Sequence, residues 1–351
     1  MADADLSDDL GRRVRAAADA GTALRLVGGD TKGFYGRAVA GEPLSLAGHA
    51  GVIAYQPSEL VITARAGTLL SDIEAILAEG GQMLAFEPPS TGPGSTLGGV
   101  VAAGLSGPRR PFAGAVRDSV LGVTVLDGLG RKLRFGGTVF KNVAGFDAFR
   151  LMAGAMGSLG VILDVSLRVA PRPRAEAALA FEMGWSEAQG RIAGLMRRPL
   201  PLSAAAHYQG RLHLRLSGPE AAVSAARAEL GGQEDEPGFW EAVRHMTLPA
   251  FTPPKGLWRL SVPPLSQVDL PGEMFIDWGG AQRWLAAGED ATRVRIAAAT
   301  AGGHAVLFFG EGPAETPFAP LAPALHALHK RLKAALDPKG VLNPGRLYPD
   351  L

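Results

Sequence analysis

Two glycine-rich segments in the first hundred residues carry the residue types that bind phosphate. The first reads GGDTKG, over residues 28–33, and the second reads STGPGSTLGG, over residues 90–99. Backbone without a Cβ can turn its N–H groups toward an anion and let a phosphate approach closely. Ser95 and Thr96 precede the apolar run VVAAGL, so we expect their hydroxyls at a helix N-terminus, beside a bound pyrophosphate. Tight turns alone would also explain either segment.

Neither segment is a standard nucleotide-binding fingerprint. The pattern G-x-x-x-x-G-K-[ST] is missing from the chain, which excludes a P-loop. GPGSTLG has three residues before its third glycine, and no strand leads directly into it. A Rossmann dinucleotide fold therefore fits poorly.

A third segment decides between these interpretations. Residues 141–162 read KNVAGFDAFRLMAGAMGSLGVI, which combines a polar turn, a helix and the glycines Gly154, Gly157 and Gly160 before a strand. Together with the other segments it resembles the vanillyl-alcohol-oxidase or PCMH-type FAD-binding family. The matching motifs are GGDTK at 28–32, TLGG at 96–99, KNVAGFD at 141–147, GAMGSLGVI at 154–162 and DPKGVLNPG at 337–345. They follow the family's order over nearly the whole chain.

The resemblance implies a cofactor and the residues that bind it. The cofactor would be FAD, held in extended form between two α/β subdomains. The implied cofactor-binding residues are Gly28, Gly29, Asp30, Thr31, Lys32, Ser95, Thr96, Gly98, Gly99, Asn142, Gly145, Gly157, Gly160, Val161, Ile162 and Asn343. The resemblance assigns no catalytic residue.

Within that family the chain is most similar to the smaller FAD-binding subunits of bacterial glycolate oxidases. This implies oxidation of glycolate, a small 2-hydroxy acid, to glyoxylate, with a larger catalytic FAD subunit and an iron–sulfur subunit as partners. The chain itself would be an accessory or electron-relay flavin subunit. Two alternatives stay open. One is a free-standing FAD-dependent 2-hydroxy-acid dehydrogenase, in which Arg259 or Arg346 would bind the substrate carboxylate. The other is a structural subunit without cofactor.

Departures from the family pattern concern histidine. Family members with covalent FAD use a histidine in the first glycine loop, whereas this loop reads GGDTK and the nearest histidine is His49. We therefore predict non-covalent FAD. Members that oxidise 2-hydroxy acids hold a divalent metal with a histidine pair. His207 and His213 flank a predicted hairpin turn without a further ligand nearby, and His304 lacks acidic companions, so we predict no metal site.

Composition limits the other functions. The 351 residues carry 35 basic and 34 acidic side chains, which gives no basic surface for nucleic acid. The chain has no cysteine, so it has no disulfide, no cysteinyl flavin bond and no cysteine-ligated iron–sulfur cluster of its own. Residues 88–108 are uncharged but too rich in proline and glycine to span a membrane. We expect a cytoplasmic protein. Any contact with the inner membrane would be peripheral and made through its partners.

The elements that must position these residues alternate between strand and helix. Glycine and proline separate them, which predicts an α+β (mixed α/β) protein. We expect a PCMH-type FAD-binding domain over 1–172 and a smaller C-terminal α/β domain over 173–351, with 337–347 returning toward the flavin. Predicted strands are 23–27, 52–55, 60–64, 120–126, 132–135 and 160–169, with a hairpin over 204–216. Predicted helices are 9–20, 71–79 with Ser71 as N-cap, 149–155, 220–230 and 320–336.

Overall fold

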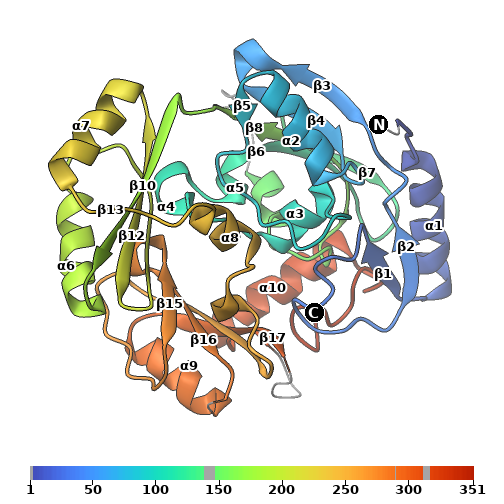
Figure 1. Ribbon diagram of the computed structural model, residues 1–351. Coiled ribbons are helices and arrows are strands. Elements are labelled where there is room, and N and C mark those ends of the chain that lie inside the picture. The colour runs from blue at the N-terminus through green and yellow to red at the C-terminus, as the bar shows by residue number, and fades with distance from the viewer. Residues whose placement is uncertain (1–2, 138–146, 289, 311–316) are drawn as a thin grey trace. The chain divides into compact units, whose positions relative to one another are not determined.

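The computed structural model describes residues 3–137, 147–288, 290–310 and 317–351. Its contacts divide the chain into two compact units (Figure 1). Unit 1 contains residues 1–105, 115–171 and 320–351, and unit 2 contains 106–114 and 172–319. The predicted range 173–351 differs from this division, because residues 320–351 return to pack in unit 1. The short segment 106–114 likewise belongs to unit 2.

Unit 1 is built around an antiparallel five-stranded sheet of order β3-β4-β8-β6-β7. Parallel β1–β2 and antiparallel β5–β9 form two further pairs. The elements of unit 1 are α1 (Ser7–Ala20), β1 (Leu24–Val27), β2 (Glu42–Ser45), β3 (Val52–Gln56), η1 (Pro57–Glu59), β4 (Val61–Arg65), α2 (Leu70–Glu79), β5 (Gln82–Met83), α3 (Leu97–Ala103), α5 (Val116–Ser119), β6 (Val120–Leu126), β7 (Lys132–Gly136), η2 (Ala148–Met152), β8 (Val161–Arg168), β9 (Ala170–Pro171) and α10 (Pro323–Leu336).

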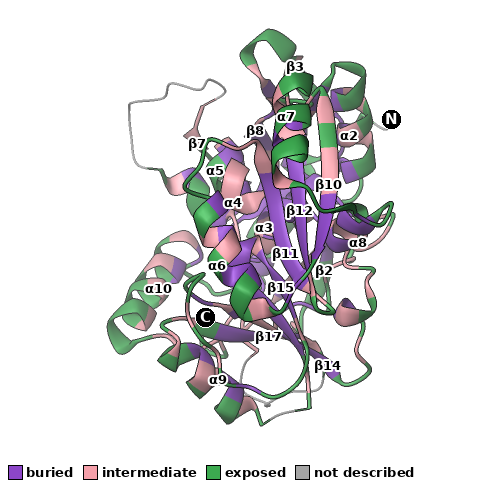
Figure 2. Ribbon diagram, turned by 60° about the vertical axis from the view of Figure 1, so that its left-hand side comes forward, coloured by how far each residue is buried: buried purple, intermediate pink, exposed green. Residues whose placement is uncertain are grey.

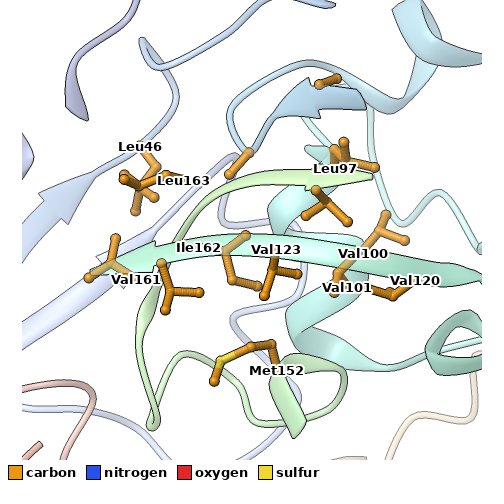
Figure 3. Close-up of a cluster of buried hydrophobic side chains, with 14 of the residues drawn as sticks. Leu46, Leu97, Val100, Val101, Val120, Val123, Met152, Val161, Ile162 and Leu163 are labelled. Atoms are coloured by element: carbon orange, nitrogen blue, oxygen red, sulfur yellow. The ribbon is translucent and has the colours of Figure 1, made fainter. Parts of the chain in front are cut away.

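The core of unit 1 lies where β6 and β8 pack against α3 and η2 (Figure 3). Val101 of α3, Val123 of β6 and Ile162 of β8 are among the buried side chains there. The apolar run Val120–Leu126 is buried along almost its whole length, as expected of a central strand covered on both faces. This core holds α3, and with it the second glycine segment, in a defined place against the sheet.

The C-terminal segment extends the β1–β2 pair of unit 1. The Leu24 N–H donates to the Val341 carbonyl at 2.7 Å, and the Asn343 N–H donates to the Leu24 carbonyl at 3.0 Å. Residues 341–343 therefore lie beside the strand that leads into the first glycine loop. This is the physical reason why residues 320–351 belong to unit 1.

Unit 2 contains an antiparallel eight-stranded sheet of order β13-β10-β12-β11-β15-β16-β14-β17. Helices α6 and α7 bury their apolar sides against β10 to β12 in one core cluster, and α9 packs against β17 in another. The elements of unit 2 are α4 (Arg110–Ala113), β10 (Ala175–Glu182), α6 (Trp185–Leu195), β11 (Leu202–Tyr208), β12 (Arg211–Gly218), α7 (Glu220–Leu230), β13 (Gln233–Glu234), α8 (Phe239–His245), η3 (Pro249–Phe251), β14 (Gly256–Ser261), β15 (Met274–Asp277), η4 (Trp278–Gly280), β16 (Gln282–Ala286), α9 (Ala291–Thr300) and β17 (His304–Gly310).

Most predicted elements are present within one to three residues of their predicted bounds. The hairpin over 204–216 turns at Gln209 and Gly210, whose φ angles of 48° and 72° are those of a two-residue hairpin turn. Two details differ. Helix α2 begins at Leu70 without a side-chain cap, because the Leu70 N–H donates to the Ser95 carbonyl instead. The predicted helix over 149–155 is a short 3-10 helix, η2. No helix within the described ranges is long and apolar enough to cross a membrane.

Candidate cofactor site

A cavity of about 370 Å³ opens in unit 1 between β1, the loop over 28–33 and α3. A second cavity of about 90 Å³ adjoins it and shares Gly28, Thr96, Met156 and Asn343 as lining. Volumes of this order are typical of sites for small molecules and cofactors. Of the predicted site residues, the two cavities are lined by Gly28, Gly29, Asp30, Thr31, Lys32, Thr96, Gly98, Gly99, Gly157, Gly160, Ile162 and Asn343.

The two glycine segments pack against each other, backbone to backbone. A Cβ at Gly29 would lie 1.6 Å from the Gly94 carbonyl oxygen, and a Cβ at Gly28 would lie 2.4 Å from Oγ1 of Thr96. Any side chain at either position would push the two loops apart. Glycine is therefore needed for the loops to meet, and the same lack of side chains leaves backbone open to a ligand.

The side chains of the two loops form a small polar cluster beside the cavity. The hydroxyls of Thr31 and Ser95 lie 3.0 Å apart, and Nζ of Lys32 donates to Ser95 Oγ at 3.3 Å. Burial lowers the pKa of Lys32 to about 8, and none of the ion pairs formed by described residues includes this amine. A partly buried ammonium held only by hydroxyls gains most from an anionic ligand.

The lining carries a surplus of positive charge. Its charged side chains are Arg25, Asp30, Lys32 and Arg346, which gives three cations against one carboxylate among the described residues. The carboxylate is already engaged, because Arg25 Nη1 lies 3.1 Å from Oδ2 of Asp30. The lining therefore keeps a net positive charge, which suits the diphosphate of a dinucleotide.

Three non-glycine residues that line this cavity have strained backbone conformations. Asp30, Met156 and Asn343 all line it, and their φ angles are 52°, 50° and 42°. Residues other than glycine rarely adopt positive φ, and such conformations persist where the surrounding contacts enforce them, often at functional sites.

The side chains of Asn343 and Arg346 hold the backbone around the cavity in these conformations through hydrogen bonds. Oδ1 of Asn343 accepts the Leu26 N–H at 2.8 Å, while its Nδ2 donates to the Met156 carbonyl at 2.6 Å. The Arg346 guanidinium donates to four carbonyls of the first glycine loop and the residues after it. These are the carbonyls of Lys32, Gly33, Tyr35 and Arg37. The C-terminal motif thus holds the first glycine loop in place, and burial lowers the pKa of Arg346.

Of the predicted residues that the structure describes, two are outside the cavity lining. Ser95 is buried behind the first loop, where it contacts Thr31 and Lys32, and Val161 is a core residue of β8. Asn142 and Gly145 lie outside the described residues. Sequence reasoning also missed lining residues. It did not place Arg25, Tyr35, Ala102 or Met156 at the site, and it considered Arg346 only as a substrate ligand. The alternation of Arg25 with buried Leu24 on a predicted strand would have pointed to the first of these.

The two histidines of the hairpin do not form a pair. His207 is opposite Leu212 in the register of β11 and β12, and Ala206 is opposite His213, so the two rings lie on opposite faces of the sheet. His207 packs near Trp185, whereas His213 binds Asp235 through Nδ1 at 3.0 Å and stacks on a phenylalanine of α8. Across the part of the chain that the structure describes, no three potential metal ligands come together.

The comparisons with known proteins agree with this geometry. Residues 4–136 match the model of an FAD binding domain, and residues 320–347 match that of the C-terminal domain of FAD linked oxidases. The chain is 47% identical to glycolate oxidase subunit GlcE of Escherichia coli (strain K12), over all of both chains. The chain belongs to the GlcE family. The predictions of FAD as cofactor and of an FAD-dependent oxidoreductase subunit are thereby confirmed.

More distant relatives share parts of the chain. Glycolate oxidase subunit GlcD of Bacillus subtilis (strain 168) is 32% identical over 36% of this chain and 27% of its own length. A solved structure of alkyldihydroxyacetonephosphate synthase matches 97% of this chain and 76% of its own, with a TM-score of 0.68 and 15% identity. That likeness shows the fold alone, and it confirms the predicted mixed α/β class.

Proposed function

We propose that this chain binds FAD in the unit 1 cavity and acts as a flavin subunit of a complex that oxidises glycolate to glyoxylate. The full-length identity to GlcE carries this proposal. The oxidation removes two electrons and two protons from the hydroxyl-bearing carbon and its hydroxyl group. Bound flavin would accept electrons and pass them on, since the chain has no cysteine to hold a cluster.

Two observations support the fit of FAD to the lining. The amine of Lys32 is partly buried among hydroxyls with no carboxylate partner in the described residues, so a phosphate oxygen would complete its bonds. Gly28 and Gly29 line the cavity with backbone alone, and their lack of a Cβ lets the second glycine segment pack directly against them. We assign the diphosphate to the side of the cavity formed by Lys32 and the first glycine loop. The smaller cavity beside Gly98, Gly157 and Ile162 would receive a flatter, less polar part of the cofactor.

We further propose that FAD is held without a covalent bond. The described lining of the two cavities contains no histidine, and His49 is buried elsewhere with Nδ1 bound to the Leu6 N–H. Acid precipitation of the purified chain should release the yellow flavin into the supernatant. Colour retained in the washed pellet would contradict this.

A relay role for this flavin is the finer part of the proposal. The separation of His207 and His213 onto two faces of one sheet leaves them unable to hold one metal or one substrate together. Arg346, a candidate for substrate carboxylate binding, already donates to four carbonyls. We therefore assign substrate oxidation to a larger flavin subunit, with an iron–sulfur subunit as the next carrier.

The experiment separates relay from catalysis. The chain is purified alone with FAD, and glycolate-dependent reduction of an artificial dye is measured beside the complete complex. We expect turnover from the complex and none above background from the chain alone. Turnover by the isolated chain would refute the relay role while leaving FAD binding intact. Co-purification followed by flavin and iron counts tests the partners, and fractionation of cells tests the proposed cytoplasmic location.

A further inference from the structure

Helix α10 is unusual because its apolar side chains are exposed or only half-buried. Over its fourteen residues the one buried side chain is Lys333. Leu325 and Leu328 are 44% and 50% exposed, and α10 is drawn mostly in the colours of exposed and intermediate residues (Figure 2). Helices of globular proteins are normally stabilised by burying an apolar face. Single exposed leucines are common, but a helix whose one fully buried side chain is a lysine requires an explanation.

Lys333 explains how the helix is held in spite of this. Its Nζ donates to the carbonyls of Ser158 and Leu342 at 2.8 and 2.7 Å and to Oδ2 of Asp337 at 2.7 Å. A buried ammonium with three acceptors fastens the end of α10 to unit 1. Leu336 also packs, half-buried, against the core of unit 1, so the exposed Leu325 and Leu328 are not needed to attach the helix.

A cavity of about 390 Å³ lies beside the apolar side of α10. Leu325, Leu328 and Leu332 are spaced by three and four residues, so they share one side of the helix, and Leu332 lines the cavity. Leu151 of η2, which is 44% exposed, lines it from another element. We call Leu151, Leu325, Leu328 and Leu332, together with this cavity, the α10 surface.

The cavity of the α10 surface is lined by basic side chains. They are Arg117, Arg150 and Lys333, of which Lys333 is paired with Asp337, and no acidic side chain of the described residues is part of the lining. Arg117 and Arg150 do approach the carboxylates of Asp118 and Asp147, at 3.7 and 3.4 Å, but these arginines are 69% and 46% exposed. Exposed pairs of this kind contribute little, so a carboxylate from a partner can replace them.

The cavity also lies close to the cofactor site along the chain. Met156 and Gly157 line the cofactor cavities, whereas their neighbours Ala155 and Ser158 line the cavity beside α10. One turn of backbone therefore separates the two spaces. A protein bound at the α10 surface would be near the bound flavin, as an electron-transfer partner must be.

We propose that the α10 surface is the docking site for another subunit of the oxidase, which inserts an apolar side chain flanked by carboxylates. This inference rests on the proposed function, since it assumes the complex. A hollow suits an inserted side chain better than it suits a flat lipid surface. The exposed apolar residues of α10 are aliphatic, without the aromatic residues common at membrane interfaces. In addition, Asp350 pairs with His326 and Lys330 of α10, which reduces the positive charge that the helix would offer to anionic lipid.

The test uses the complete complex. The tagged chain is co-expressed with the other oxidase subunits, and the co-purified subunits are quantified for the wild type and for Leu328→Asp. Ile53→Asp is the matched control, because Ile53 is 49% exposed on β3 of the same unit. We expect Leu328→Asp to lower partner recovery at least tenfold, with FAD content and melting temperature like those of the control. Arg150→Glu should weaken recovery in the same direction, and more so at low salt.

Each other outcome has a defined meaning. Recovery from Leu328→Asp equal to that from Ile53→Asp overturns the proposal. A wild-type chain that recovers no partner refutes the proposed complex instead. If Leu328→Asp unfolds, Arg150→Glu decides, because unchanged recovery at low salt then overturns the docking site. Flotation of the wild type, but not of Leu328→Asp, with vesicles containing anionic phospholipid would assign the surface to a membrane. A dimer that Leu328→Asp converts to a monomer would assign it to a second copy, and both results overturn the proposal.

Discussion

Replacing Lys32 with methionine tests the assigned phosphate site most directly, because the change should affect binding and stability in opposite directions. Methionine keeps much of the length of the side chain and removes its charge. In the protein without ligand, burial lowers the pKa of Lys32 from 10.5 to about 8, so the charged amine is held at a cost in folding free energy. That cost is at most about 3 kcal/mol, and solvent screening reduces it because the side chain is only partly buried. The variant without FAD should therefore melt no lower than the wild type.

Affinity for FAD should fall in the same variant. A charge-assisted hydrogen bond to phosphate contributes about 1.5–3 kcal/mol, which corresponds to a roughly 10- to 150-fold increase in Kd. The pH dependence of FAD affinity gives a second test of the same assignment. Below about pH 8 the amine is charged, and a bound phosphate raises its pKa. Wild-type affinity should therefore be constant at lower pH and fall as the pH rises above about 8, by up to tenfold per unit. Lys32→Met should lack this dependence.

Quenching of FAD fluorescence during titration into the protein without cofactor measures the Kd for FAD and, when repeated across pH, the pH dependence of that Kd. Lys132→Met, on the exposed edge strand β7, is the control for loss of a lysine charge in the same unit. An Lys32→Met protein that binds FAD within twofold of the control, or that keeps the wild-type pH dependence, would refute the assignment of phosphate to Lys32.

Three further predictions concern the loops, the C-terminal motif and metal. Gly29→Ala should lower the free energy of unfolding by several kcal/mol and abolish FAD retention, since its Cβ would lie 1.6 Å from the Gly94 carbonyl oxygen. Gly190→Ala is the control, because its Cβ would have nothing within 4 Å, and it should be neutral or stabilising in thermal melts. Arg346→Lys should lower the free energy of unfolding by about 1–3 kcal/mol and raise the Kd for FAD, because one ammonium cannot reach the four carbonyls; unchanged FAD affinity would contradict this role. Chelator treatment of the isolated chain should leave its FAD affinity unchanged, because His213 binds Asp235 and not a metal cluster; a loss restored by a divalent ion would show otherwise.

Local sequence signals predicted most helices and strands well, but they did not predict the N-cap of α2 or the packing of residues 320–351. Apolar runs located β6 and β8, and the predicted hairpin over 204–216 is present with its turn at Gln209 and Gly210. Ser71 was wrong as the N-cap of α2, because a backbone carbonyl from the distant Ser95 satisfies the N–H at the beginning of the helix. A partner that distant in sequence leaves no local trace. The same reason explains why residues 320–351, which follow a domain of their own in sequence, pack in unit 1.

The sequence by itself determined the chemistry of the site. Glycines at positions 28 and 29, hydroxyls at 31, 95 and 96, and the amine of Lys32 are residue types that suit a phosphate-bearing cofactor, and their order identified the family. Only the tertiary structure decided how these residues meet. The contact between Gly29 and Gly94, the burial that lowers the pKa of Lys32 and the hold of Arg346 on the first loop all join residues far apart in the chain. Periodicity and turn signals report interactions within a few residues, whereas steric exclusion and burial depend on the packed neighbours.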